Sequence, residues 1–437
     1  MAETTSKLRF IHLSDIHFSN RVAHIGFDPD EYMRNELRLD VETQIRKLDA
    51  AANAILVSGD IAFAGKKNEY ESAAAWLDEI CDAAGCERDA VYVCPGNHDI
   101  DQQVIRDNFM IADGQEAIRR GTTLYEREKA LMDRLVQPVA RDLFYAPLRE
   151  YNEFAVRYGC SFYGDKENFA LDRDFPLNDG SLLRLRVMNS ALLSGLQDAE
   201  QSLFLGQRAW TMPQATNVTF MTMAHHPPSW LLDRREIEGA LNGRAKIQLF
   251  GHEHDQRVVM GRDWAKLFAG SVNPHRAEPN WRPGYNILEI HVEEGSPRIM
   301  VVDVHAREWQ GEPPQFRAYE DINNAPVHRN RIDLPPLKAL PRPVVVEVPA
   351  STTVTAGHSP PATGATAQPL TMRSIMNRFF RLTLSQKNEI IGRLKLADEA
   401  DKGLPDFERF KLALYRAKEN ARLIDVDRMI SQREGKA

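Results

Sequence analysis

The first hundred residues alternate short apolar runs with amphipathic segments, and this alternation constrains the fold more than any other feature of the chain. Residues 8–14, 54–58 and 91–94 are apolar enough for buried strands, whereas residues 41–52 and 69–84 carry apolar side chains at helical spacing. A strand, helix, strand order repeated in this way predicts a largely parallel sheet with helices packed on its faces. We therefore expect the N-terminal part of the chain to be α/β.

Polar side chains follow each of these three predicted strands at once. They are Asp15 and His17 after the first strand, Asp60 after the second, and Asn97, His98 and Asp99 after the third. In open sheets of this kind, ligands bind outside the carboxyl ends of the strands. The clustering therefore predicts a functional site at this edge of the sheet.

The next part of the chain predicts a helical insertion and then a second sheet. Residues 102–160 are helical and charged, and they either cover the site or act as a spacer on the sheet edge. Strands are then expected to return at 181–189, 217–224 and 247–250, and the short strands after them, at 266–269, 285–292 and 298–305, indicate a second sheet. A second sheet packed on the first would give a β-sandwich flanked by helices.

The chain divides near residue 370 in both composition and charge. Residues 321–370 are rich in Pro, Ala, Thr and Val, which predicts an extended linker between a main unit at 1–320 and a tail at 371–437. The tail has apolar residues at helical spacing and predicts a small all-helical domain. Its 15 basic and 10 acidic residues give it +5, and the rest of the chain carries −12.

Composition excludes several classes of protein. A net charge of −7 over 437 residues argues against a chain that is basic throughout and coats nucleic acid. Residues 1–18 lack a signal-peptide pattern, and no run approaches the roughly 18 apolar residues that cross a bilayer. The four cysteines form no C-x-x-C pair. We expect a soluble cytoplasmic protein that does not bind membranes.

Two later strand ends complete a set of metal-binding residue types. His225 and His226 follow the strand at 217–224, and His252 and His254 follow the strand at 247–250. Oxygen and imidazole ligands without thiolate suit manganese, iron or zinc. One carboxylate that can bridge, flanked by enough His and Asn for two coordination shells, is what a two-metal site requires. A lone His is usually a surface or core residue, but five strand ends together indicate a metal site.

In order and context, these residues resemble the motif set of the calcineurin-like metallophosphoesterases over residues 7–310. The motifs are Asp15-x-His17, Gly59-Asp60, Gly96-Asn97-His98-Asp99, His225 with Pro227, and Gly251-His252-x-His254. The resemblance implies an α/β fold, the four-layer α/β/β/α metallophosphoesterase sandwich, with two divalent metal ions, manganese favoured. It implies that Asp15, His17 and His254 hold one metal, that Asn97, His225 and His252 hold the other, and that Asp60 bridges them. His226 is the alternative to His225.

Two further residues of the third motif are candidates for catalysis. His98 belongs to neither metal shell in this scheme, so it is free to protonate the departing alkoxide. Asp99 either orients the His98 imidazole or caps the helix that begins near Ile100. His12, inside the first strand, is expected to be a core histidine.

The sequence narrows the substrate to a phosphodiester. The loop from Gly59 to Gly65 is apolar, unlike that of the protein Ser/Thr phosphatases, and it is most similar to the branch with cyclic nucleotide phosphodiesterases. We expect a nucleotide or nucleic-acid diester. The alternatives are a DNA or RNA nuclease of the same superfamily and a non-catalytic interaction protein. A basic stripe either holds a polynucleotide or is a solvated helix face; its residues are Arg234, Arg235, Arg244 and Lys246.

The tail resembles the small helical effector-associated adaptor domains of bacterial conflict systems. The resemblance is carried by the run from Phe379 to Leu384, the apolar spacing after Glu389, and Arg416-Ala417. It implies an effector of an antiviral defence-type system that is recruited to a protein partner. The alternative is a helical oligomerisation module.

Overall fold

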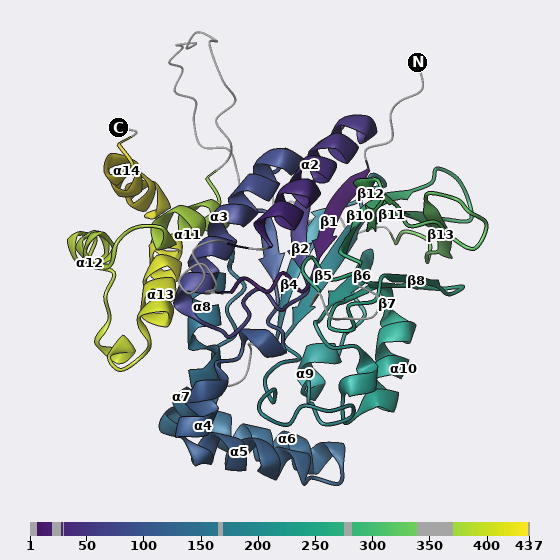
Figure 1. Cartoon of the computed structure of the whole chain (residues 1–437). Coiled ribbons are helices and arrows are strands. Elements are labelled where there is room, and N and C mark those ends of the chain that lie inside the picture. The colour runs from purple at the N-terminus through teal and green to yellow at the C-terminus, as the bar shows by residue number, and fades with distance from the viewer. Residues whose placement is uncertain are drawn as a thin grey trace, which may run out of the picture.

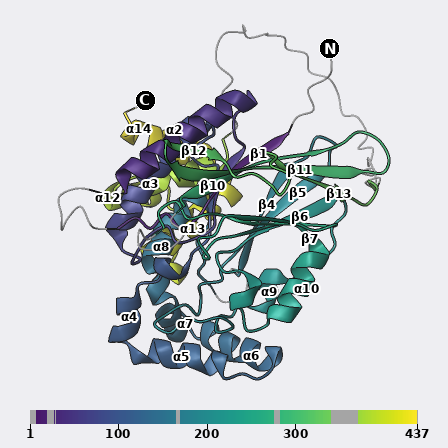
Figure 2. The ribbon, with the colours of Figure 1, turned by 45° about the vertical axis from the view of Figure 1, so that its right-hand side comes forward.

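The computed structural model describes residues 7–19, 28, 30–164, 169–274, 282–338 and 370–435. Two mixed sheets lie face to face between two layers of helices, which Figure 2 shows from the side. The predicted four-layer α/β/β/α sandwich is confirmed. Within the described ranges, no helix has the length and apolar character needed to cross a bilayer.

The first sheet contains the three N-terminal strands as parallel neighbours. They are β1 (Leu8–Leu13), β2 (Ala54–Val57) and β3 (Val91–Val93), with α2 (Glu31–Leu48) and α3 (Lys67–Ala84) as crossover helices. Antiparallel strands extend the sheet beyond β1 in the order β10 (Gly284–Val292), β11 (Ile299–Gly311) and β12 (Pro314–Ala318). The expectation that residues 285–292 and 298–305 belong to the second sheet is therefore wrong, because β10 pairs with β1 of the first. All residues of β1, β2 and β3 are buried, which is why these strands lack a polar alternation.

The second sheet has the strand order β4-β5-β6-β7-β9-β8. Its strands are β4 (Ala170–Pro176), β5 (Leu182–Met188), β6 (Val218–Met223), β7 (Ala245–Phe250), β8 (Arg257–Met260) and β9 (Ala265–Phe268). The helices α9 (Gln207–Trp210) and α10 (Arg234–Arg244) cover its outer face (Figure 2). Between the sheets, the rings of Phe10 and Phe175 meet edge to face with centroids 5.0 Å apart.

The predicted insertion is helical and lies at one end of the molecule (Figure 1). It consists of α4 (Gln102–Asp107), α5 (Phe109–Arg119), α6 (Leu124–Leu135), α7 (Pro138–Tyr145) and α8 (Arg149–Ala155). Gln115 and Arg119 of α5 donate to the carbonyls of Ser194 and Leu193, which belong to the loop after β5. The insertion therefore holds a loop that starts at the carboxyl edge of the second sheet.

The linker prediction is wrong for residues 328–333. These residues form β13 (His328–Asp333), which pairs antiparallel with β11. The sequence does not predict this strand, because it is rich in charged residues and so lacks an apolar pattern. These charges pair across the sheet, as Arg329 does with Asp303 at 2.6 Å. Of the predicted linker, residues 339–369 lie outside the described residues.

The tail is all-helical, as predicted, and it packs on the main unit. Its helices are α11 (Met372–Phe380), α12 (Leu384–Arg393), α13 (Asp406–Glu419) and α14 (Leu423–Arg433). Arg373 of α11 donates to the carbonyls of Asp89, Val91 and Tyr158, and its guanidinium lies 4.2 Å from the Tyr92 ring centroid. In Figure 1 the helical tail lies beside α3 and α8.

Candidate metal centre

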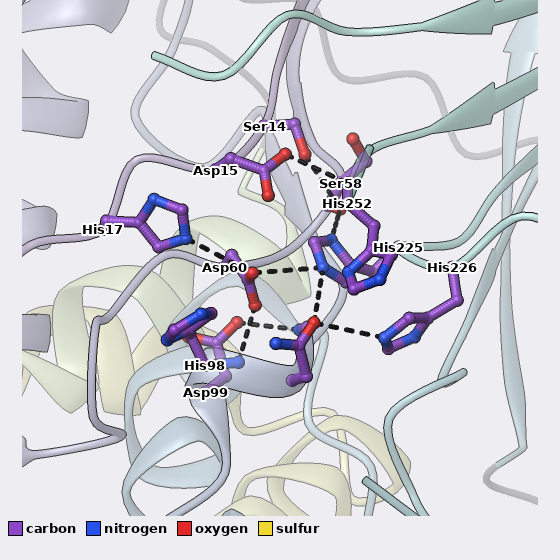
Figure 3. Close-up of polar contacts among 12 residues, drawn as sticks. Ser14, Asp15, His17, Ser58, Asp60, His98, Asp99, His225, His226 and His252 are labelled. Atoms are coloured by element: carbon purple, nitrogen blue, oxygen red, sulfur yellow. Dashed lines mark hydrogen bonds and ion pairs between the residues drawn. The ribbon is translucent and has the colours of Figure 1, made fainter. Parts of the chain in front are cut away.

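The polar residues after five strands meet at one edge of the sandwich (Figure 3). The first sheet supplies the residues after β1, β2 and β3, and the second sheet supplies those after β6 and β7. The predicted site residues that come together are Asp15, His17, Asp60, Asn97, His98, His225, His226, His252 and His254. The two sheets therefore contribute to one site, as the order of strand ends predicts.

Asp60, Asn97 and His252 are each preceded by a glycine, and each glycine lets a residue from another strand end approach closely. A Cβ at Gly59 would lie 2.5 Å from His225 Nδ1, and a Cβ at Gly96 would lie 2.6 Å from the backbone nitrogen of Asp60. A Cβ at Gly251 would overlap Ser14 Oγ. The Gly-Asp, Gly-Asn and Gly-His pairs are thus explained by close packing of the strand ends on one another.

One cluster of ligand-type side chains consists of Asp15, His17 and His254. His254 Nε2 lies 3.1 Å from Asp15 Oδ1, and His17 Nδ1 donates to the carbonyl of Asn273 at 3.3 Å. Burial alone would raise the pKa of Asp15, but the imidazoles of His254 and His225 hold this pKa below its usual range. The carboxylate is therefore ionised at neutral pH and available to a cation.

A second cluster consists of His225, His226 and His252, with Asn97 beside it. The Nε2 atoms of His225 and His226 both lie 3.2 Å from Asn97 Oδ1. His225 Nδ1 donates to the Ser58 carbonyl at 2.7 Å, whereas His226 Nδ1 lies 2.9 Å from Ser190 Oγ. Both neighbouring imidazoles therefore direct Nε2 toward Asn97, and His225 Nε2 also lies 3.2 Å from Asp60 Oδ2.

Asp60 lies between the two clusters (Figure 3). Its Oδ2 is 3.3 Å from His17 Nε2 and 3.2 Å from His225 Nε2, and its Oδ1 accepts from the His98 amide at 2.7 Å. Burial opposes ionisation of Asp60, but His225 and His17 hold its pKa well below the usual range. Burial lowers the pKa of His225, yet the negative charge of Asp60 outweighs it and raises this pKa to about 9. Asp60 thus faces both clusters as a carboxylate.

The donor atoms fit divalent metal ions. Two ligands at about 2.1 Å and at right angles are about 3.0 Å apart, close to the 3.1–3.3 Å separations found between side chains here. The ligand types are imidazole nitrogen, carboxylate and amide oxygen, which suit manganese, iron or zinc. The carbonyls of Ser58 and Asn273 orient His225 and His17, as outer partners of metal-bound imidazoles do.

Asp99 does not contact the His98 imidazole, so the predicted orienting role is wrong. The Asp99 carboxylate instead accepts from the amides of Ile61, Ala62 and Gly96 and from the Tyr70 hydroxyl. His98 Nδ1 donates to the Phe63 carbonyl at 2.8 Å, which leaves Nε2 without the proton in the neutral ring. The alternative, that Asp99 caps the helix expected near Ile100, is also not found, because that helix, α4, begins at Gln102 and its N-cap is Asp101, whose side chain accepts from the Gln103 amide at 3.1 Å.

Sequence reasoning missed the residues that orient the imidazoles of the site. They are Ser58, Phe63, Ser190 and Asn273, of which three act through backbone carbonyls. A backbone contact leaves no signal in residue type. Ser190 could have been found, because it follows the strand β5 as the other site residues follow theirs. His12 is a core histidine, as predicted, with its Nε2 2.9 Å from Ser58 Oγ.

The family signature agrees with the fold and the site. The sequence model of the calcineurin-like phosphoesterases matches residues 8–256, more than half of the chain, and the protein belongs to this family. The family generally binds two divalent metals. Residues 371–432 match the GTPase-associated adaptor domain, so the predicted adaptor resemblance of the tail is confirmed.

Comparison with known proteins beyond the family signature finds distant likenesses. No functionally curated protein matches the chain. A candidate 5′-nucleotidase from Staphylococcus aureus is 13% identical over 66% of this chain at a TM-score of 0.33, and the chain covers 52% of its length. A Vps29 single mutant from Entamoeba histolytica is 10% identical over 75% of this chain and all of its own, at a TM-score of 0.29. A predicted phosphoesterase from Streptococcus pneumoniae is 11% identical over 70% of this chain and 99% of its own, at 0.26. Likenesses this distant carry no argument about function.

Proposed function

We propose that this protein is a dinuclear-metal-dependent phosphodiesterase that hydrolyses a nucleotide or nucleic-acid diester. The observation that carries the proposal is Asp60, a buried carboxylate within 3.3 Å of imidazoles from both clusters. A single carboxylate between two ligand sets is what two neighbouring metal ions share. Phosphoesterase chemistry itself follows from the family.

In this proposal the ligand set is the one that the sequence motifs imply. Asp15, His17 and His254 hold one ion, Asn97, His225 and His252 hold the other, and Asp60 bridges them; manganese is favoured. Bound divalent ions supply Lewis acidity, which lowers the pKa of water and neutralises phosphoryl charge. His226 stays an alternative to His225, since the Nε2 atoms of both lie 3.2 Å from Asn97 Oδ1.

His98 is the proposed proton donor to the leaving group. Its Nδ1 proton is held by the Phe63 carbonyl, so Nε2 is the atom that gains and gives up a proton. The ring is partly exposed and lies 4.8 Å from the His17 ring, at the rim of the centre. A proton delivered there would neutralise the departing alkoxide oxygen of a diester.

The substrate class rests on the apolar loop from Gly59 to Gly65 and on charge. The exposed ring of Phe63, 44% accessible, stands in this loop beside His98, where a protein phosphatase would carry charged groups. The −12 charge outside the tail disfavours tight binding of a nucleic-acid duplex, so a small nucleotide diester is favoured over a polymer. A nuclease of the same superfamily is the competing outcome.

The tail gives the enzyme a protein partner in this proposal. We take residues 1–320 as the catalytic unit, extended by β13, and 371–437 as the adaptor that recruits it, in the manner of a defence-type effector acting in the cytoplasm. The helical insertion at 102–160 would then bear on substrate access, because α5 holds the loop after β5.

The metal-loaded full chain should hydrolyse bis-p-nitrophenyl phosphate. It is assayed with manganese, zinc or iron on this diester, on p-nitrophenyl phosphate, on cyclic nucleotides and on single-stranded DNA and RNA. Asp60→Asn should lower turnover by at least about a hundredfold, and a chelator should abolish it. The control is Asp263→Asn, an exposed carboxylate between β8 and β9, which should leave turnover unchanged. Turnover of the monoester alone would refute the diesterase, and polymer cleavage alone would favour the nuclease.

A further inference from the structure

The Asp99 carboxylate is fully buried and accepts four hydrogen bonds, two at each oxygen. Oδ1 accepts from the Ala62 amide at 3.0 Å and from the Tyr70 hydroxyl at 2.9 Å. Oδ2 accepts from the amides of Ile61 at 3.2 Å and Gly96 at 2.9 Å. Tyr70 is the side chain among these four donors, and the other three are backbone groups.

The three backbone donors flank the proposed metal ligands. Ile61 and Ala62 directly follow Asp60, and Gly96 directly precedes Asn97. Asp99 thereby ties the loop after β2 to the loop after β3, at the positions where each loop presents its ligand. A rotation of the Asp99 carboxylate would release both loops at once, and the Tyr70 hydroxyl is the side-chain contact that opposes this rotation.

We propose that Tyr70 is a positioning residue of the metal centre, acting through Asp99. The inference rests on the ligand set of the proposed function. Tyr70 belongs to α3, is buried, and stacks on Phe154 of α8 with ring centroids 5.1 Å apart. Its hydroxyl is therefore held from behind by packing, which is the arrangement a positioning residue needs.

The same aromatic pair borders the adaptor domain. Tyr70 and Phe154 line a groove of about 410 Å³ whose other wall includes Phe380, Phe407 and Phe410 of the tail. The tail is fixed to α3 by a two-pronged ion pair in which Arg381 donates to both Asp78 oxygens, at 2.6 and 2.7 Å. The seating of the adaptor therefore bears on Tyr70, and through Tyr70 on the two ligand loops.

The matched comparison is Tyr70→Phe against Tyr151→Phe in the full chain. Tyr151 is also a buried tyrosine and contacts the Tyr70 ring, but its hydroxyl donates to the Val93 carbonyl at 3.1 Å instead of to Asp99. Manganese binding is measured by isothermal titration calorimetry, and the visible spectrum of the cobalt-loaded protein reports ligand geometry. We expect Tyr70→Phe to bind manganese about tenfold more weakly and to shift the cobalt spectrum, with Tyr151→Phe within twofold of wild type.

Amide hydrogen exchange provides a second measurement. The amides of Ile61, Ala62 and Gly96 should exchange faster in Tyr70→Phe and not in Tyr151→Phe. Equal metal binding, spectra and exchange in the two variants would overturn the inference. If Tyr70→Phe does not fold, Phe154→Leu removes the ring behind Tyr70, and manganese binding within twofold of wild type would then overturn it. Absence of manganese binding by the wild-type chain would instead count against the proposed function.

The adaptor contact is tested with Arg373→Ala, which removes the donors that seat α11. We expect weaker manganese binding in this variant, by about threefold or more, because α11, which carries Phe380 of the groove's second wall, would be held less firmly against the main unit. In the Tyr70→Phe background the same substitution should have little further effect. Additive losses in the double variant would show that the adaptor does not act through Tyr70. An unchanged manganese affinity in Arg373→Ala would show that the adaptor contact does not influence the metal centre.

Discussion

Gly96→Ala adds a single methyl group to the chain and should disable the metal centre. The new Cβ would lie 2.6 Å from the Asp60 backbone nitrogen and closer still to Asp60 Oδ1. Ordinary contact begins near 3.4 Å, so the two loops must separate by about 0.8 Å. Because Gly96 N also donates to Asp99, the separation strains the contact that joins the loops.

The magnitude follows from this displacement. Overpacking of this kind costs about 1–3 kcal/mol of unfolding free energy. A misplacement near 1 Å at a reacting centre costs about a hundredfold in rate. We therefore expect Gly96→Ala to fold, with an unfolding free energy lower by about 2 kcal/mol, and to lose about a hundredfold in kcat/KM on bis-p-nitrophenyl phosphate.

The control for this prediction is Gly239→Ala in α10. Gly239 is exposed and a Cβ there meets nothing within 4 Å, so the substitution should stabilise the helix by about 0.5–1 kcal/mol and leave turnover unchanged. Urea unfolding and diester turnover are measured for both variants. Turnover within twofold of wild type in Gly96→Ala would refute the reasoning that the motif glycines exist to let the loops approach.

Two more predictions concern stability away from the metal centre. Burial opposes ionisation of Glu289, but His305 and Arg9 outweigh it and lower its pKa to about 2 from 4.5. The ionised Glu289 side chain therefore adds to the free energy of unfolding above pH 4.5, and this contribution is lost as the pH falls toward 2. Over this range the free energy of unfolding of the wild type, measured with urea, should fall by up to about 3 kcal/mol more than that of Glu289→Gln. The same pH dependence in the two proteins would contradict this. Arg373→Ala should destabilise the chain by about 3 kcal/mol, since it removes the donor to three part-buried carbonyls, those of Asp89, Tyr158 and Val91. Arg393→Ala, which breaks an exposed pair with Glu389, should cost under about 0.5 kcal/mol, and equal losses would refute the docking argument.

The central strands could be predicted from the sequence because they are buried on both faces. The expected strands at 8–14, 54–58 and 91–94 correspond to β1, β2 and β3. Their apolar runs are long enough to separate from the amphipathic helices between them. The polar residues at their ends could be predicted to form one site, since parallel strands end at one edge.

The outer strands β4 and β13 could not be predicted in the same way. Asp172 and Asp174 of β4 lie opposite Arg186 and Arg184 of β5 and pair with them at 2.7 and 2.6 Å. In β13, Arg329 pairs with Asp303 of β11. Edge strands that are stabilised by cross-strand ion pairs have no apolar alternation to read, and their charges resemble those of a loop.

Asp99 illustrates why residue roles are harder to predict than residue membership of a site. Its place beside His98 in the sequence suggested that it orients that ring. In the structure the carboxylate points instead to three amides and Tyr70, because consecutive residues of a 3₁₀ turn direct their side chains differently. Tyr70 lies 29 positions away in sequence, so this contact leaves no local signal.

Backbone conformation at the site explains how the motifs reach one another. Asp15, His17, Asp60, His252 and His254 have φ angles between 51° and 71°, in the left-handed region that non-glycine residues rarely adopt. Each such residue costs roughly 1 kcal/mol or more, and the cost recurs at five of the seven proposed ligands. The left-handed turns let the loop after β1 pair with the loop after β2, where the amides of Ile16 and His17 both donate to the Asp60 carbonyl, at 2.8 and 3.0 Å. The strained conformations are therefore retained where they bring carboxylates and imidazoles together, and metal binding is the interaction that would offset their cost.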